Sequence, residues 1–385
     1  MTIISAPRLV IGNRVVGPGA VVVEDGVITD VIEGRPAPGP HHLALEEGLL
    51  GPGLIDVQIN GCLGVDFAQA GLEEWQTVCA ALPTHGVTAF QPTIITNPIP
   101  DLVASLRRFT ETRPKLEGAG ARPLGMHVEG PFISPERRGV HDPRHMCHPT
   151  PDNLAPLLAE RTAITMVTLA PELPGAMVAI RELVAAGIVV SIGHSDARAT
   201  DVHEAVLAGA RMVTHIFNAQ RGLTHREPGV AGQALVEPAL TLGLIADFHH
   251  VAPQVCALVM NAAPGRVALV TDAVAPAGMP PGLYQLAGQR IRLAAGDPLA
   301  RNLNGTIAGA AIFLDQAVRN LVGIGRNIGE VIHAASTVPA TVLGRNDLGR
   351  LTPGAAADLV WWSDTLAPLR TWVAGNTVYQ ADSVI

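Results

Sequence analysis

Four residues in the middle of the chain carry the side chains that a hydrolytic metal site uses. Glu129, His194 and His215 offer one carboxylate and two imidazoles, which suit Zn²⁺ or another borderline divalent ion and leave a coordination position for water. Such an ion lowers the pKa of its water to about 7 and polarises a carbonyl group. Asp272 offers a carboxylate that could take the water proton and pass it to a leaving amine. Together these residue types indicate metal-dependent hydrolysis.

Each of the four taken alone is more often a structural residue, so their shared context decides the interpretation. Each ends a short apolar run, and these runs alternate with helical patterns such as residues 102–112, 177–186 and 199–208. Eight runs are predicted strands: residues 53–57, 88–93, 123–128, 164–169, 188–192, 212–214, 241–246 and 267–271. The alternation favours an α/β fold, a (β/α)₈ TIM-like barrel, in which the C-terminal strand ends converge on one face that holds the active site.

The two ends of the chain have a different pattern from the middle. Residues 8–10, 19–23 and 27–31 near the start, and 358–362, 369–373 and 376–379 near the end, are apolar and β-branched runs separated by turn residues. We therefore predict a small β-sandwich domain built from both termini, residues 1–52 and 346–385. Residues 53–345 are predicted to form the barrel.

Composition excludes several classes of protein. The 385 residues carry a net charge of −8 and no stripe of Lys and Arg, so no nucleic-acid partner is expected. No apolar run reaches about 18 residues, so no membrane association is expected. The four cysteines are scattered without metal-binding or disulfide spacing, and the N-terminus does not have the pattern of a signal peptide. The expected location is the cytoplasm.

Several short motifs make the prediction more specific. They are PGLID at 52–56, HVEGPF at 127–132, GHSDA at 193–197, THIFNA at 214–219, REPG at 226–229, LVTDA at 269–273 and NGTIAG at 304–309. In these motifs and in their order over nearly the whole chain, the protein resembles the amidohydrolase superfamily and, within it, the N-acetylglucosamine-6-phosphate deacetylases. Any one motif is weak evidence, but the ordered set is strong.

The resemblance implies roles for the residues at the strand ends. Glu129, His194 and His215 would bind the metal, Asp272 would be the general base, and His141 would orient or polarise the acetyl carbonyl. Many amidohydrolases hold a second metal with a His-x-His motif after the first strand, where this chain has Gln58 and Asn60. Because neutral amides are poor ligands for transition metals, we expect one divalent ion per subunit, Zn²⁺ first, with Fe²⁺, Mn²⁺ and Co²⁺ as alternatives.

The resemblance also implies how a phosphorylated N-acetyl amino sugar would be bound. The phosphate would meet the backbone amides of Asn218 and Ala219 and the side chains of Arg226 and His250. Arg226 would come from the neighbouring subunit, which predicts a homodimer. The expected lining of the substrate pocket adds Val140, Ile307, Ala308 and Gly309. Phe248 and His249 depart from the small and aliphatic residues typical of the family and are expected near the sugar.

The implied reaction is hydrolysis of the N-acetyl group of N-acetyl-D-glucosamine 6-phosphate to D-glucosamine 6-phosphate and acetate, in amino-sugar catabolism. One alternative changes the substrate to another N-acyl hexosamine phosphate, such as N-acetylgalactosamine 6-phosphate. A second alternative is a catalytically inactive barrel that acts as a binding protein. The intact set of Glu129, His194, His215 and Asp272 disfavours the inactive barrel.

Overall fold

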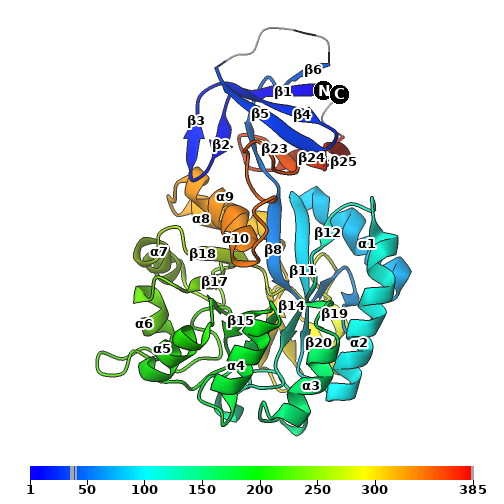
Figure 1. Ribbon diagram of the computed structural model, residues 1–385. Helices are drawn as coiled ribbons and strands as arrows, with labels where there is room; N and C mark the ends of the chain where they lie inside the picture. The colour runs from blue at the N-terminus through cyan, green and yellow to red at the C-terminus, as the bar shows by residue number, and fades with distance from the viewer. Residues whose placement is uncertain (35–38, 40, 383–385) are drawn as a thin grey trace.

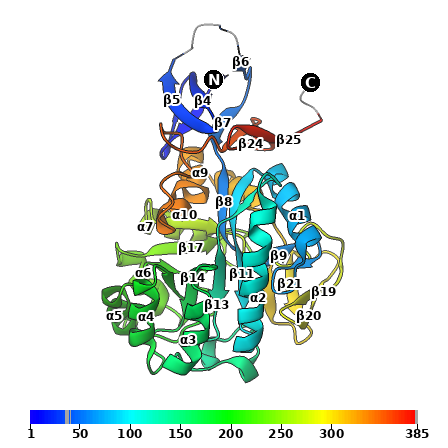
Figure 2. The ribbon, with the colours of Figure 1, turned by 45° about the vertical axis from the view of Figure 1, so that its right-hand side comes forward.

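The centre of the molecule is a barrel of eight parallel strands (Figures 1 and 2). The structure is a computed structural model and describes residues 1–34, 39 and 41–382. The barrel strands are β8 (Leu54–Ile59), β11 (Val87–Ile95), β13 (Met126–Glu129), β14 (Ile164–Leu169), β15 (Val189–Ile192), β16 (Met212–Val213), β17 (Thr241–Ile245) and β18 (Val267–Val270). Each pairs in parallel with the next along the chain. All eight predicted strands are therefore confirmed.

The ends of the sheet meet through backbone hydrogen bonds just beyond the last strand. The Asp272 N–H donates to the Gln58 carbonyl at 2.8 Å, and the Asn60 N–H donates to the Ala273 carbonyl at 2.7 Å. One predicted boundary was wrong, since the run 123–128 is not one strand. Its start belongs to the separate short strand β12 (Arg122–Pro123), because Gly125 at φ 141° turns the chain before β13 begins.

Ten α-helices surround or extend the barrel. They are α1 (Leu72–Ala81), α2 (Ile99–Thr112), α3 (Pro151–Ala159), α4 (Ala176–Ala185), α5 (Ala199–Ala208), α6 (Gly229–Val236), α7 (Pro253–Ala262), α8 (Leu314–Gly323), α9 (Ile328–Ala335) and α10 (Thr337–Val342) within the described residues. Short 3₁₀ helices lie at Leu82–His85, Arg113–Leu116, Pro135–Arg137 and Pro143–His145, and β9 (Gly61–Cys62) pairs with β10 (Val65–Asp66). Among the helices of the described residues, none combines the length and apolar character needed to cross a bilayer.

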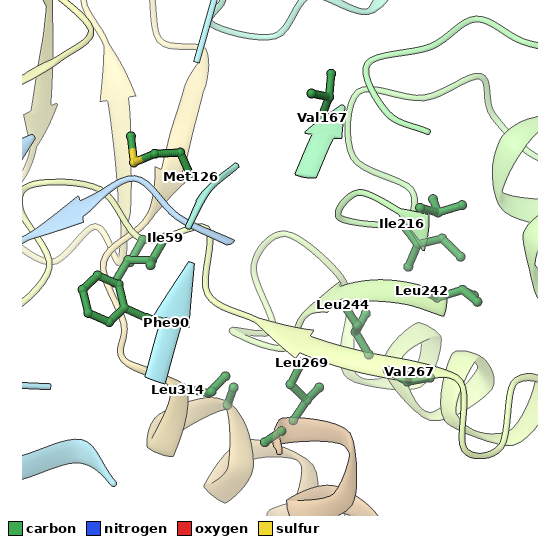
Figure 3. Packing of buried hydrophobic residues seen from close by; sticks show 14 of the residues in the cluster. Ile59, Phe90, Met126, Val167, Ile216, Leu242, Leu244, Val267, Leu269 and Leu314 are labelled. Atoms are coloured by element: carbon green, nitrogen blue, oxygen red, sulfur yellow. The ribbon is translucent and has the colours of Figure 1, made fainter. Parts of the chain in front are cut away.

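The main hydrophobic core lies between the barrel and its helices and is built mostly from aliphatic side chains. In α2, Leu102, Leu106 and Phe109 recur at helical spacing and form the buried face. Figure 3 shows Leu269 of β18 and Leu244 of β17 among the buried side chains of this core, with Leu314 of α8 nearby. Packing of this kind holds the strands in a fixed frame, so the loops at their ends start from defined positions.

Both termini build a β-sandwich beside the barrel (Figure 1). One sheet holds β1 (Thr2–Ala6), β4 (Gly19–Glu24), β5 (Val27–Glu33) and β6 (His42–Ala44), and the other holds β2 (Leu9–Ile11), β3 (Arg14–Val16), β7 (Leu49–Pro52), β23 (Leu359–Trp362), β24 (Pro368–Val373) and β25 (Asn376–Gln380). Val21 and Ile28 of the first sheet share a core with Leu50, Leu359 and Trp372 of the second. The predicted sandwich of both termini is confirmed.

A four-stranded antiparallel sheet between β18 and α8 was not predicted. Its strands are β19 (Gly282–Leu286), β20 (Gln289–Leu293), β21 (Leu299–Asn302) and β22 (Ile307–Ala310). The sheet packs against Ile95 at the end of β11 and Val140 in the loop that follows β13. The Gln289 side-chain amide also donates to the Val140 carbonyl at 3.1 Å. The sheet thus lies over the C-terminal end of the barrel.

Candidate active site

The three predicted metal ligands meet at the C-terminal end of the barrel. Glu129 is the last residue of β13, His194 follows β15, and His215 follows β16. Glu129 Oε1 lies 3.1 Å from His194 Nε2 and 2.9 Å from His215 Nε2, and the two imidazole nitrogens are 3.1 Å apart. All three side chains are buried. In sequence, Glu129 is 65 positions from His194 and 86 positions from His215. The fold nevertheless brings the ligand atoms of all three to one point.

This arrangement fits a divalent metal ion. At metal–ligand distances of about 2.0–2.1 Å, the ligand atoms of a tetrahedral site lie roughly 3.3 Å apart, close to the separations seen here. The His194 Nδ1 lies 3.0 Å from the Arg137 carbonyl oxygen. Because a carbonyl oxygen can only accept a hydrogen bond, Nδ1 carries the proton and Nε2 keeps its lone pair. His141 also offers a nitrogen within 4.8 Å of the Glu129 and His194 ligand atoms. His215 Nε2 is the nearer third candidate, because it lies 2.9 Å from Glu129 Oε1 and 3.1 Å from His194 Nε2.

Backbone conformations turn the site residues toward the barrel axis. His194, His215 and Asp272 have φ values of 47°, 26° and 51°, in the left-handed region that residues other than glycine seldom adopt. Each lies two residues after the last residue of its strand. Non-glycine residues in this region cost free energy and are found where the surrounding structure fixes them. Here these conformations occur just after the strands, where the backbone turns away from the strand direction.

Burial and hydrogen bonding act in opposite directions on the ionisable groups among the candidate ligands. Burial raises the pKa of Glu129, but the hydrogen bonds and charges of His194 and His215 outweigh burial and hold this pKa well below its usual value. Burial lowers the pKa of His215, and the hydrogen bond to Glu129 outweighs it and raises the pKa instead. The carboxylate is therefore ionised and available as a ligand. A bound cation would replace the imidazole protons as its partner.

Asp272 lies beside this group with its carboxylate held by two amide side chains. Its Oδ1 accepts from Asn60 Nδ2 at 2.7 Å and from Gln58 Nε2 at 3.2 Å, while the same Gln58 Nε2 lies 3.2 Å from Glu129 Oε1. Burial, followed by the charge of Glu129, raises the pKa of Asp272 to about 7. A carboxyl group with a pKa near neutral can both accept and return a proton. Gln58 and Asn60 thus orient the two carboxylates in this structure.

His141 closes the other side of the site. Its ring centroid lies 4.2 Å from that of His194, and burial holds its pKa well below the usual value, so the ring is neutral. The Thr96 backbone N–H donates to His141 Nδ1 at 3.4 Å, and the Thr96 hydroxyl lies 2.7 Å from the same nitrogen. Because Nδ1 accepts, the proton of the neutral ring is on Nε2. His141 therefore has one N–H to offer.

These residues line a single cavity of about 360 Å³. Of the residues predicted for the site, the cavity brings together Glu129, Val140, His141, His194, His215, Asn218, Ala219, His250, Asp272, Ile307, Ala308 and Gly309. Arg226 is not among its lining residues and is exposed. Sequence reasoning missed Arg137 and Thr306, which also line the cavity. The pair RR at 137–138, before the GVH segment, was the only sequence signal for Arg137.

The β22 strand reaches the cavity only because Gly309 has no side chain. Gly309 has a φ of 135°, and a Cβ atom there would lie 2.6 Å from the Asp272 carbonyl oxygen. The following Ala310 N–H donates to that same carbonyl at 3.0 Å. The close approach of β22 therefore also fixes the backbone of Asp272.

The end of the cavity away from the metal ligands is formed by two loops. In the loop after β16, Phe217 and Ala219 have φ values of 75° and 49°, and alternation of this kind makes the anion-binding turn called a nest. The Asn218 N–H already donates to the His215 carbonyl at 3.0 Å. The Ala219 N–H has no hydrogen-bond partner among the described residues. This amide is therefore the better placed of the two to meet an anion.

The loop after β17 brings His250 into the same end. Asp247 accepts the His249 and His250 backbone N–H groups at 2.9 and 2.8 Å, and its second oxygen lies 2.6 Å from His250 Nδ1. Burial raises the pKa of Asp247, but the bonds from His250 outweigh it and lower the pKa. The carboxylate therefore fixes the orientation of the His250 ring.

Phe248 and His249 were expected near the sugar, and neither is among the lining residues of this cavity. Phe248 has a φ of 67° and packs against the hydrophobic core, and His249 is exposed. The turn around Asp247 explains the difference, since it directs His250 inward and its two predecessors elsewhere.

Comparison with known proteins agrees with this geometry. The curated N-acetylglucosamine-6-phosphate deacetylase of Danio rerio is 37% identical over 88% of this chain and 87% of its own length. The N-acetylgalactosamine-6-phosphate deacetylase of Escherichia coli O157:H7 is 36% identical over 85% of this chain and 87% of its length. A solved structure of a mutant N-acetyl-D-glucosamine-6-phosphate deacetylase from Mycobacterium smegmatis, in complex with N-acetyl-D-glucosamine-6-phosphate, superposes with a TM-score of 0.92 at 31% identity. It covers 98% of this chain and 99% of that chain. Residues 49–378 match the amidohydrolase family, and the chain belongs to that family.

Proposed function

We propose that this protein is a metal-dependent deacetylase that hydrolyses the N-acetyl group of N-acetyl-D-glucosamine 6-phosphate, releasing D-glucosamine 6-phosphate and acetate in amino-sugar catabolism. The observation that carries the proposal is the convergence of Glu129, His194 and His215 on one point, with Asp272 in the same cavity. The names of the relatives support the choice of substrate.

The proposed cofactor is one divalent ion per subunit, held by Glu129, His194 and His215, with Zn²⁺ as the first candidate and Fe²⁺, Mn²⁺ and Co²⁺ as alternatives. When bound there, the ion supplies Lewis acidity toward water and the acetyl carbonyl. A single ion is supported by the amide side chains of Gln58 and Asn60, which donate hydrogen bonds to the neighbouring carboxylates. The remaining donor atoms of these two side chains are neutral amide oxygens, which are poor ligands for a transition metal beside imidazole.

The remaining steps of the proposed mechanism belong to protein side chains. Asp272 takes a proton from the attacking water and later donates it to the amine of the leaving sugar. His141 donates its Nε2 hydrogen to the carbonyl oxygen, on which negative charge develops as water attacks. Val140, Ile307, Ala308 and Gly309 form the wall beside these groups and keep water out of this part of the cavity.

Binding of the phosphate is proposed at the loop end of the cavity. The free N–H of Ala219, the neighbouring Asn218 amide and the His250 ring support this assignment. Arg226 is proposed to reach this end from the second subunit of a homodimer. Two observations support a role in trans: Arg226 is exposed, and its guanidinium has no ion-pair partner within the described residues of its own chain.

The proposal includes the organisation and location of the protein. We assign residues 1–52 and 346–385 to the sandwich domain and 53–345 to the barrel, which is consistent with β7 and β8 being separated only by Gly53. The proposed location is the cytoplasm, supported by four cysteines that are all free.

The test is acetate release by metal-replete protein from N-acetyl-D-glucosamine 6-phosphate, compared with the unphosphorylated sugar. The expected result is fast turnover that requires the phosphate and is abolished by a chelator and restored by Zn²⁺. Metal binding without acetate release would reject this substrate and keep the metal site.

A second candidate substrate is N-acetyl-D-galactosamine 6-phosphate, favoured by the 36% identity to a deacetylase named for that sugar. The same assay with both epimers separates the two. A higher kcat/KM for the galacto epimer would replace the glucosamine substrate and leave the mechanism unchanged.

A further inference from the structure

A chain of buried polar side chains lies directly beneath the candidate metal ligands. His127 of β13, Thr168 of β14, Ser191 of β15 and Thr214 after β16 are each at most 1% exposed. Three contacts of 2.6 Å connect them: His127 Nε2 to Thr168 Oγ1, Thr168 Oγ1 to Thr214 Oγ1, and Thr214 Oγ1 to Ser191 Oγ. The chain therefore crosses four neighbouring barrel strands in a single layer.

Three members of this polar layer are close in sequence to the candidate metal ligands. His127 lies two residues before Glu129, Ser191 lies three before His194, and Thr214 immediately precedes His215. Each of the three ligand-bearing strands thus has one side chain in the layer. Thr168 connects them from β14, the one strand in the group that carries no ligand.

The donors and acceptors of these four side chains give their hydrogen bonds one direction. A neutral imidazole has one N–H donor and one acceptor nitrogen. The Thr93 hydroxyl donates to the Gln91 backbone carbonyl at 3.3 Å, so it can only accept from the His127 ring. The Thr93 hydroxyl lies 3.5 Å from Nδ1, and Nε2 faces Thr168. With Nδ1 as the donor, Nε2 accepts from Thr168, Thr168 from Thr214, and Thr214 from Ser191.

A layer of this kind is not needed to fill the core. Apolar side chains of the same volume would fill the space without the desolvation of four polar groups. Hydrogen bonds differ from apolar contacts in fixing distance and direction, and a fully satisfied buried network specifies one arrangement of its strands. The hydrogen-bonded layer therefore fixes the relative positions of these strands more tightly than apolar packing alone would.

We infer that His127, Thr168, Thr214 and Ser191 are positioning residues that set the relative heights of β13, β15 and β16, so that the atoms of Glu129, His194 and His215 meet at the spacing a metal ion requires. This inference rests on the proposed metal site. The layer acts through the strands and touches neither metal nor substrate. Metal affinity is the property that it controls.

The test compares two threonines of the same strand. Thr168→Val removes the hydroxyl at the centre of the layer with little change of shape. Thr165→Val is the matched control, because the Thr165 hydroxyl also bonds a buried side chain across strands, Gln91 Nε2 at 2.6 Å, but has no link to the layer. The equilibrium Kd for Zn²⁺ is measured by competition with a chromogenic chelator, together with the Tm of the metal-free proteins.

The expected result is a metal affinity about 10- to 100-fold weaker for Thr168→Val, the range found when groups that support metal ligands are removed. Thr165→Val is expected to keep the affinity of the unmodified protein. Thr168→Ser, which returns the hydroxyl, is expected to restore most of the lost affinity. Ser191→Ala removes only the end of the layer and provides a milder variant if Thr168→Val does not fold, with a smaller loss expected.

Equal Kd values for Thr168→Val, Ser191→Ala and the unmodified protein would overturn the inference. So would a loss that Thr165→Val shares in proportion to its loss of Tm, because the layer would then act on stability alone. If the unmodified protein binds no Zn²⁺, the proposed function fails, and the inference fails with it. If the unmodified protein binds Zn²⁺ and the variants bind it equally, only the inference fails.

Discussion

The two ends of the cavity are built in different ways. At the metal end, Glu129, His194, His215 and Asp272 extend from the ends of β13, β15, β16 and β18 of one chain, and all four side chains are in contact or share partners. At the phosphate end, Asn218, Ala219 and His250 lie in loops, and Arg226 is exposed. A rigid frame places the groups proposed to react, whereas longer connections place the groups proposed to bind the substrate.

The difference has a physical basis. Chemistry requires ligand atoms held within a few tenths of an ångström, and packed strands provide that precision better than loops. Binding of a phosphate tolerates more variation, because backbone N–H groups and cations attract an anion from several directions. Changes at the metal end are therefore expected to lower kcat, and changes at the phosphate end to raise KM. The contrast between the two ends would fail if kcat and KM responded otherwise.

The largest effect is expected from Asp272→Asn. The amide keeps the shape of the side chain but cannot take a proton from water, so kcat should fall by about 10²- to 10⁴-fold, the usual contribution of a general base. KM and bound metal are expected to change little, since Asp272 is not assigned as a ligand. Turnover is measured by acetate release, and bound Zn²⁺ by elemental analysis of the same protein. An unchanged kcat would remove Asp272 from the mechanism.

A somewhat smaller effect is expected from His141→Asn. Loss of one donor to a developing oxyanion typically lowers kcat about 10²- to 10³-fold. His145→Asn is the matched control, because His145 lies four residues further in the same loop and does not line the cavity. If both variants lost the same activity, the loop as a whole would matter and His141 would have no specific role. Steady-state kinetics of the two variants decide this.

The contrast between the ends also explains what could be predicted from the sequence. All eight barrel strands could be predicted, and so could the meeting of Glu129, His194, His215 and Asp272 in one cavity, because strand ends of a parallel barrel must converge. Arg137 was missed, although it lines the cavity and its carbonyl holds His194, 57 residues away. That contact depends on how a loop folds back, and no periodic pattern in the sequence encodes such a return.

The sheet β19–β22 was missed for a related reason. Its first strand, Gly282–Leu286, alternates exposed and partly buried residues over only five positions, a weak pattern beside the apolar runs of the barrel. Yet this sheet provides Ile307 and Ala308 to the cavity wall. The motif NGTIAG marked these residues only through resemblance, and their position over the barrel came from packing against Ile95 and Val140.

Arg226→Ala tests whether the phosphate end is shared between subunits. Loss of a charged hydrogen bond of about 1.5–3 kcal/mol should raise KM about 10- to 100-fold for the phosphorylated substrate, with kcat nearly unchanged. Arg181→Ala, at an exposed position of α4, is the control and should have no effect. Mixing Arg226→Ala with Asp272→Asn before reassociation should restore low-KM turnover. The hybrid dimer would then contain one site with both Asp272 and the partner's arginine. Without such restoration, Arg226 would act within its own chain or not at all.

The smallest effect is expected from Asp247→Asn, which separates the orientation of His250 from its presence. The amide oxygen can still accept the backbone N–H groups of the turn, but the charged contact of 2.6 Å to His250 Nδ1 is lost. Since part of the interaction remains, KM for the phosphorylated sugar should rise about 5-fold, less than the loss of a full charge-assisted hydrogen bond.

The control for Asp247→Asn is Asp315→Asn, which alters another buried aspartate paired with a histidine, His85 Nδ1 at 3.2 Å, outside the cavity. Both variants should lose stability, and the loss should be larger for Asp315→Asn, because the Asp315 carboxylate also pairs with Arg319 Nη1 at 2.8 Å. Only Asp247→Asn should raise KM for the phosphorylated sugar while leaving the slow turnover of the unphosphorylated sugar unchanged. A fall in kcat for both sugars would instead show that His250 acts on the reacting end, and the division between the two ends of the cavity would not hold.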